Sequence, residues 1–417
     1  MTDARRPARS ARTWWLLAAG FVVVHGLLAW IDFSDAPNQP AGDVTGVYRF
    51  WVDWWHSTGV LVGIGTDWVY PIGALPPMLL AGILGDGPYL AVWLVLVAVL
   101  DAVALVLVAR RSAALAWWWL AFTLLLGPVA PARIDAVALP IAVVGVLLLA
   151  ERPAVAAVLL TLAAWVKVWP AAIVAAVLLT GRRLVGTITA AALTCAGVIG
   201  VALLAGAHGT VFSFVAAQAG RGIQVEAPVA LPWLWSAALG DPDVSVYYDT
   251  DILTFQIRGA GVQAAADAMN PVLAIGVLAL VLLAVLARRR GAAPEAVLAV
   301  TALGFVAAVI ALNKVGSPQY LTWYVAPVLL GLLVTGRRFA VPAGLVLAAA
   351  GLTQLVYPWF YGGVTAPTPW VIAVLTLRNA LEVVLLGWCL VALRTLPATA
   401  PAPSPVPAAG EAVRAGA

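Results

Sequence analysis

The chain has 417 residues, of which 63% are hydrophobic and 10% are charged, and its mean hydropathy is +1.00. A soluble globular domain has a much lower apolar share, so the composition excludes a water-soluble protein. The formal net charge of +4 does not indicate a nucleic-acid partner, because the basic residues stand in short groups between apolar runs. We therefore expect one all-α polytopic domain in a lipid bilayer, built from apolar stretches of roughly 20 residues.

The first apolar run follows a basic N-terminal segment, residues 1–12, which we place in the cytoplasm. This arrangement resembles a signal peptide, but the run continues to Phe33 without a small-residue cleavage site, and we predict that it is the first membrane span. The membrane domain then extends over residues 13–394. Residues 395–417 are rich in Ala and Pro and are predicted to form a disordered cytoplasmic tail.

Hydropathy predicts membrane spans at about 13–33, 89–108, 114–130, 136–150, 154–166, 170–181, 184–205, 270–287, 295–312, 320–335, 339–357 and 370–393. The fifth and sixth are too short to cross alone. The sequence WVKVWP between them indicates a hairpin or two half-helices that rely on neighbouring helices to satisfy their backbone. The expected total is therefore about 11 to 13 transmembrane helices.

The arginines predict the orientation. With the N-terminus in the cytoplasm, the Arg groups between spans all fall on the cytoplasmic side, as the positive-inside rule requires. These are Arg110 and Arg111, Arg152, Arg182 and Arg183, Arg288 to Arg290, Arg337 and Arg338, and Arg394. The two long loops, residues 34–88 and 206–269, then lie outside, so we predict a multi-pass protein of the cytoplasmic membrane whose active site faces the extracytoplasmic side.

Lysine is used at only two positions, Lys167 and Lys314, whereas 21 of the 23 basic residues are arginine. Each lysine lies at the outer end of a span and is followed by a proline, in AWVKVWP and NKVGSPQY. An ammonium at the membrane boundary suits a phosphate oxygen. The alternative interpretation is that both side chains extend to the interface only to reach water.

Three further charges, Arg133 and Asp135 in APARID and Arg378 in the last span, lie near the predicted outer surface. An ionisable residue at that depth is functional by default. The alternative is an ion pair that holds helices together, such as Arg378 with Glu382 at i, i+4 spacing. Both interpretations stay open from the sequence.

Asp43 lies about ten residues beyond the first span, in GDVTGVYRFW, and is followed by Tyr48, Arg49 and Asp53. A carboxylate in this loop suits a general base that accepts a proton from an incoming hydroxyl. Spacing alone favours equally a helix N-cap at Asp43.

Metal-ligand patterns are weak. The segment GDPDVSVYYDTD, residues 240–251, resembles an Asp-x-Asp metal motif, but two carboxylates in a Pro-containing loop usually form a solvated turn. The three histidines are scattered, and Cys195 and Cys389 lie in apolar stretches as small core residues. We predict no metal and no other cofactor.

Several strings together resemble glycosyltransferase family 87, within the GT-C superfamily of polytopic membrane transferases. They are GDVTGVYRF, DWVYPIGALP, RIDAVALP, LAAWVKVWPA and NKVGSPQYLTWYVAP, and their order and topological positions match over nearly the whole chain. The resemblance implies a GT-C-like fold and a polyprenyl-phosphate sugar donor, usually mannose or arabinofuranose. It also implies a glycolipid or lipid-linked glycan acceptor.

By this resemblance Asp43 matches the catalytic aspartate of the family, and Lys167 and Lys314 match basic positions near the donor phosphate. Gln319 and Tyr320 belong to the SPQY string. We add to the substrate-binding set Tyr48, Arg49, Arg133 and Arg378. The family needs no metal.

The resulting hypothesis is an inverting hexosyltransferase, with mannose as the expected sugar. Polyprenyl phosphate is already a good leaving group, so cations that stabilise the departing phosphate replace the protonating acid that glycosidases use. The alternative function is a lipid or sugar transporter or flippase of the cell envelope. Transporters usually contain internal repeats and polar sites at the midplane, and the sequence has no convincing repeat. A non-catalytic assembly partner of the envelope machinery is a third hypothesis.

The predicted orientation is tested by single cysteines at Asp67 and Asp243, after removal of the thiols of Cys195 and Cys389. Because both positions lie in the predicted outer loops, we expect both to react with a membrane-impermeant thiol reagent in intact cells. Protection of both positions would contradict the predicted orientation.

Overall fold

The computed structural model describes residues 10–85, 87–180, 184–219 and 221–398, and this part of the chain is mainly helical. Seven of its segments are long and apolar enough to cross a membrane. Six are the single helices α1 (Ala11–Phe33), α4 (Tyr89–Arg111), α9 (Leu184–Leu204), α12 (Val262–Arg289), α13 (Pro294–Ala311) and α17 (Pro369–Thr395). The protein is therefore an all-α polytopic membrane protein, as the composition predicts.

The seventh segment, Pro318–Trp359, is interrupted. It contains the short helix η6 (Pro318–Tyr324), α14 (Val325–Thr335), η7 (Gly336–Phe339), α15 (Ala340–Gln354) and η8 (Leu355–Trp359). The break falls at Gly336, whose φ of 58° lies in the left-handed region that favours glycine. The two spans predicted over residues 320–335 and 339–357 correspond to α14 and α15.

Shorter apolar helices are also part of the bundle, among them α5 (Ala113–Leu126), α6 (Asp135–Leu148), α7 (Pro153–Val166) and α8 (Pro170–Thr180). The predicted break between residues 154–166 and 170–181 is confirmed, because α7 ends at Val166 and α8 begins at Pro170. Eleven of the 14 residues of α6 are buried. Helix α6 is thus largely enclosed by protein, as expected for a helix too short to cross the bilayer alone.

Close packing of α6 on α7 depends on a small residue. A Cβ added at Gly145 would lie 2.9 Å from Cγ of Leu160, which is closer than real side chains approach. Small residues allow membrane helices to come close enough for extensive van der Waals contact.

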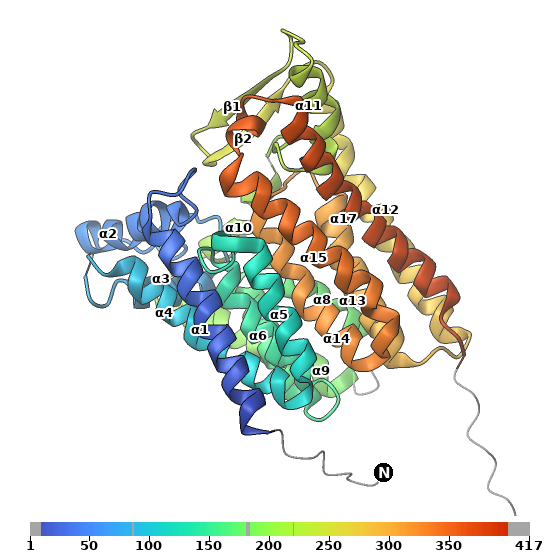
Figure 1. Cartoon of the computed structure of the whole chain (residues 1–417). Helices are drawn as coiled ribbons and strands as arrows, with labels where there is room; N and C mark the ends of the chain where they lie inside the picture. Colours follow the sequence, from blue (N-terminus) through green and yellow to red (C-terminus); the bar gives the residue numbers. More distant parts are fainter. Residues whose placement is uncertain (1–9, 86, 181–183, 220, 399–417) are drawn as a thin grey trace, which may run out of the picture.

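The segments between the long helices carry their own structure. After α1 come the π-helix η1 (Asp43–Tyr48), α2 (Arg49–Thr58), η2 (Ile72–Ala74) and α3 (Leu75–Ala81). After α9 come η4 (Gly209–Phe212), α10 (Ser213–Ala219), η5 (Pro228–Ala230) and α11 (Leu231–Ala238), and α16 (Gly362–Thr365) precedes α17. Figure 1 shows α11 at the end of the molecule opposite the start of α1 and the last turns of α17.

A β-hairpin was not predicted from the sequence. Strands β1 (Ser245–Asp249) and β2 (Thr254–Arg258) pair antiparallel, with Ser245 opposite Arg258 and Asp249 opposite Thr254. Alternating β-branched and aromatic residues favour strands in this segment. The hairpin lies beside α11 at one end of the bundle in Figure 1, and it leaves the fold class unchanged.

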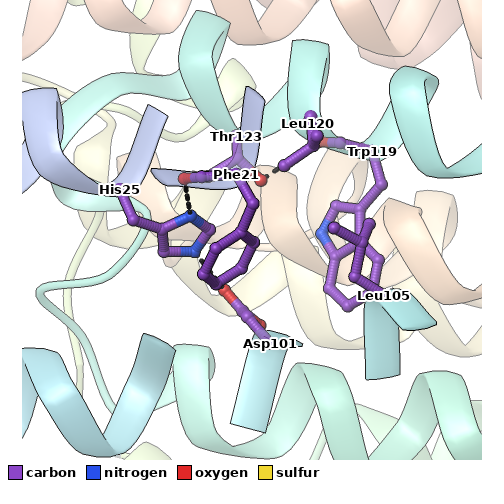
Figure 2. Close-up of a pocket in the computed structure, with 7 residues that line it drawn as sticks. All are labelled: Phe21, His25, Asp101, Leu105, Trp119, Leu120 and Thr123. Carbon is purple, nitrogen blue, oxygen red and sulfur yellow. Dashed lines mark hydrogen bonds and ion pairs between the residues drawn. The ribbon is translucent and has the colours of Figure 1, made fainter. Parts of the chain in front are cut away.

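Helices α1 and α4 are joined by a polar contact inside the bundle. His25 Nε2 lies 3.2 Å from Oδ2 of Asp101, and His25 Nδ1 lies 3.1 Å from the carbonyl oxygen of Phe21. Figure 2 shows the imidazole ring between these two groups, beside a cavity of about 10 Å³. This cavity holds about one water at most, so it is too small for a lipid-linked sugar.

Replacement of His25 tests this contact, because Oδ1 of Asp101 has no hydrogen-bond partner and His25 is the partner of Oδ2. We expect His25→Leu to lower the unfolding free energy by roughly 1–3 kcal/mol, measured by thermal or denaturant unfolding in detergent. The double variant His25→Leu/Asp101→Leu should recover most of the loss, since it removes the buried carboxylate that lost its partner. Equal losses in the single and double variants would contradict this role.

Candidate functional site

Two ion pairs meet at the turn that precedes α6. The first joins Asp43, at the start of η1, to Arg133, with Arg133 Nε 3.1 Å from Asp43 Oδ2. The Arg133 side chain is 7% exposed, whereas the Asp43 side chain is 34% exposed. The carboxylate is therefore held from the protein side and remains open on the other. The N-cap of η1 is Gly42, so Asp43 does not take the capping position that was its alternative interpretation.

The guanidinium of Arg133 has several further partners. NH1 donates to the carbonyl oxygens of Pro40 and Ala132, and NH2 donates to the hydroxyl of Tyr357 at 3.1 Å. The Tyr357 hydroxyl in turn donates to the carbonyl oxygen of Asn38 at 3.3 Å. A guanidinium has five N–H donors, so these contacts leave Arg133 little capacity for a ligand. The geometry makes it primarily the holder of Asp43 and of the loop around it.

The second ion pair lies on the other side of the same turn. Asp135 is fully buried, its Oδ1 accepts a hydrogen bond of 2.6 Å from Trp323 Nε1, and its Oδ2 lies 4.0 Å from Lys167 Nζ. The Lys167 ammonium also lies 4.5 Å from the centre of the Tyr70 ring, a cation–π contact. Lys167 thus faces Asp135 and Tyr70 from the link between α7 and α8.

Tyr48 connects the two pairs. Its hydroxyl accepts a hydrogen bond of 3.1 Å from the backbone N–H of Ile134, which lies between Arg133 and Asp135. Its ring packs against Trp93 and Tyr70 at centroid distances of 5.2 and 6.2 Å. Burial raises the pKa of the Tyr48 and Tyr70 phenols, and the neighbouring Asp43 raises both further. Both hydroxyls therefore stay protonated and neutral.

An aromatic stack borders the second pair. Tyr320 stacks on Trp323 at 4.0 Å between ring centroids, and Trp323 stacks on Trp169 at 6.3 Å. The predicted residue Tyr320 therefore joins the site through Trp323. Gln319, the next predicted residue, is buried and its Oε1 accepts a hydrogen bond of 2.6 Å from the Ser317 hydroxyl.

The remaining predicted residues lie elsewhere. Arg378 is 2% exposed and pairs with Glu382 Oε1 at 3.0 Å and with Glu226 Oε2 at 3.1 Å. The i, i+4 pair that was the alternative for Arg378 is thus present in the structure. Lys314 is buried, and its carbonyl oxygen accepts a 2.9 Å hydrogen bond from the N–H of Gln224, which places it near Glu226.

Two further predictions concern helix α2 and the loop between α11 and β1. Arg49 Nε lies 3.6 Å from Asp53 Oδ2, and both side chains are partly exposed on α2. In the Asp-x-Asp segment, Asp241 accepts hydrogen bonds from the Ser236 hydroxyl and the Asp243 N–H, which lower the pKa of its carboxyl group. This is a solvated turn. Among the described residues, no three His, Cys, Asp or Glu side chains form a group that could hold a metal ion.

Sequence reasoning recognised the charge at Asp135 but left it outside the site, and it missed Tyr70 and Trp323 altogether. Asp135 stands two residues from Arg133, and this spacing is the one signal in the sequence. Tyr70 and Trp323 lie far from Lys167 along the chain, and an aromatic residue in an apolar segment gives no local indication of its partner.

Comparison with known proteins gave no relationship: no protein-family model matches the chain, and no curated protein matches it.

The pair formed by Glu226 and Arg378 has a consequence for stability. Burial raises the pKa of Glu226 to about 7, although Arg378 opposes this shift. The folded state therefore binds a proton at Glu226 that the unfolded chain releases near its ordinary pKa of about 4.5, and this contribution to stability falls as the pH rises between these values.

We expect the unfolding temperature to be lower at about pH 7.5 than at about pH 5, and Glu226→Gln to reduce this difference. Thermal unfolding in detergent at both pH values is the measurement. Asp53→Asn, which removes an exposed carboxylate, is the control and should behave as the wild type does. An unchanged pH dependence in Glu226→Gln would refute the assignment.

Proposed function

We propose that this protein is a glycosyltransferase of the cytoplasmic membrane that uses a polyprenyl-phosphate sugar as donor. The acceptor is a glycolipid or lipid-linked glycan, and transfer takes place at the extracytoplasmic face. The observation that carries the proposal is a partly exposed carboxylate, Asp43, held by the buried Arg133 beside a second ion pair that contains Lys167. A base and a phosphate-binding cation are the two groups that this reaction needs.

Asp43 suits the general base better than Asp135. Asp135 is fully buried and accepts a hydrogen bond from Trp323, whereas the Asp43 side chain is 34% exposed and held only on one side. A base must come within hydrogen-bond distance of the proton that it removes. Asp43 therefore takes the proton of the acceptor hydroxyl, while the positive charge of Arg133 keeps the carboxylate in place.

The chemical step then balances without an acid. The acceptor oxygen forms a bond to the anomeric carbon as its proton passes to Asp43, and the bond from the anomeric carbon to the phosphate oxygen breaks. The electron pair leaves with polyprenyl phosphate, whose additional negative charge is stabilised by the ammonium of Lys167. Attack opposite the leaving group inverts the anomeric configuration.

Three other predicted residues, Tyr48, Gln319 and Tyr320, belong to this region. The Tyr48 hydroxyl accepts a hydrogen bond from the backbone of Ile134, and Tyr320 stacks on Trp323. Gln319 is the neighbour of Tyr320 in the chain. Lys314 and Arg378 lie apart from this centre, in the region of Glu226, and for Lys314 the role of a second cation for the donor rests on the sequence resemblance alone. Mannose is the proposed sugar. The outward orientation is supported by the basic residues of the opposite face.

Asp43→Asn tests the proposal, because an amide keeps the size of the side chain but cannot accept the proton. General-base catalysis supplies about a hundredfold or more, so we expect transfer from polyprenyl-phosphate mannose to be slower by at least this factor, with donor binding retained. Transfer in purified protein and donor binding are measured in parallel.

The matched control is Asp53→Asn, which changes a carboxylate on α2 whose resolved partner is the exposed Arg49. Exposed pairs contribute little to stability, so this variant should transfer sugar as the wild type does. Near-normal transfer by Asp43→Asn would show that Asp43 is not the base, and if neither Asp43→Asn nor Lys167→Met affects transfer or donor binding, the glycosyltransferase proposal fails.

A further inference from the structure

We propose that Asp135 is a positioning residue that keeps Lys167 charged and directs its ammonium toward the donor phosphate. This inference rests on the proposed function, and it adds a residue that acts through Lys167 rather than on the substrate. The observation behind it is the arrangement of Trp323, Asp135 and Lys167, in which each carboxylate oxygen of Asp135 faces one partner.

The distances assign different tasks to the two oxygens. Trp323 Nε1 donates to Oδ1 at 2.6 Å, and this hydrogen bond fixes the orientation of the carboxylate. Oδ2 lies 4.0 Å from Lys167 Nζ, which is within range of charge attraction but beyond hydrogen-bond length. Lys167 is therefore held by charge while its three N–H donors are not consumed by Asp135.

A purely structural role explains Asp135 less well. A fully buried carboxylate is costly unless it is paired and hydrogen-bonded, and Oδ2 has no hydrogen-bond partner. A structural ion pair would be expected to close to hydrogen-bond distance. The open 4.0 Å gap, with the Tyr70 ring on another side of the ammonium, suits a cation whose donors are reserved for a ligand anion.

The charge of Lys167 depends on its surroundings. Burial lowers the pKa of its ammonium, and the nearby positive charges of Arg221 and Arg133 lower it further. Asp135 is the largest influence in the opposite direction, followed by Asp43. Tyr70, which is neutral because burial raises the pKa of its phenol, also faces the group. Loss of Asp135 therefore favours the neutral amine, and the ammonium is lost at a lower pH.

The first experiment needs no donor. Lys314→Arg leaves Lys167 as the only lysine in the chain, so acylation of Lys167 by a small amine-reactive reagent is followed by mass spectrometry as a function of pH. Because only the neutral amine reacts, the pH at half-maximal rate reports the state of Lys167. We expect Asp135→Asn in this background to shift that pH downward by about one unit or more.

Trp323→Phe is the matched control. It removes the hydrogen bond to Oδ1 and keeps an aromatic ring, while the charge of Asp135 remains. Its pH at half-maximal rate should stay close to that of the parent protein. An equal downward shift in Trp323→Phe and Asp135→Asn, or no shift in Asp135→Asn, would overturn the proposal.

The second experiment joins Asp135 to donor binding, with a short-chain polyprenyl-phosphate mannose as the probe. Between about pH 6 and about pH 8.5, both proteins are compared for their loss of affinity for this donor. We expect the loss to be about tenfold larger in Asp135→Asn than in the wild type. In a Lys167→Met background, Asp135→Asn should have no further effect on affinity, whereas loss of packing would persist there. A persistent effect would overturn the positioning role.

The two experiments separate the two proposals. A shift in lysine reactivity without any change in donor binding upholds the link between Asp135 and Lys167 but removes the donor phosphate as its purpose, which overturns the inference.

If Asp135→Asn does not fold, the double variant Asp135→Asn/Lys167→Met decides. Recovery of folding shows that Asp135 balances the charge of Lys167, and failure to recover assigns Asp135 a structural role.

Discussion

The candidate site depends on the contacts that the buried guanidinium of Arg133 makes. It binds the carboxylate of Asp43, the carbonyl oxygens of Pro40 and Ala132, and the hydroxyl of Tyr357. These partners come from the segment after α1, from the turn before α6 and from η8, which are far apart in the chain. A planar group with five donors suits this task better than a lysine would. Without Arg133, nothing in this set of contacts would hold Asp43 at the turn.

Charge balance explains the arrangement around this centre. Arg133 and Asp135 lie on either side of Ile134, and each has an opposite charge from another segment, Asp43 and Lys167 respectively. Buried charges are tolerated when they are paired and hydrogen-bonded. The two pairs differ in exposure, because the Asp43 carboxylate is partly open and Asp135 is enclosed by protein. Because of this difference, Asp43 can contact a substrate, whereas Asp135 can act only on its protein neighbours.

A second charged centre links α17 to the segment that follows α10. Arg378 holds Glu382 on its own helix and Glu226 from the preceding segment, and its NH2 also donates to the carbonyl oxygen of Glu226 at 3.3 Å. Gly316 packs here so closely that a Cβ would lie 2.4 Å from the backbone nitrogen of Ala227. The NKVGSPQY string, which contains Lys314, therefore packs against backbone to which Arg378 donates a hydrogen bond.

The sequence by itself determined the membrane class and the positions of the apolar helices, because hydrophobicity and helix length are local properties that the bilayer imposes. It also indicated Asp43, Arg133 and Lys167 as unusual charges, since an ionisable residue is costly near the membrane. Only the tertiary structure decided how these charges pair. The β-hairpin, the hydrogen bond from Trp323 to Asp135 and the contact of Tyr70 with Lys167 join residues that are distant in the chain. Such pairings depend on how helices pack in space, and neither periodicity nor composition records this.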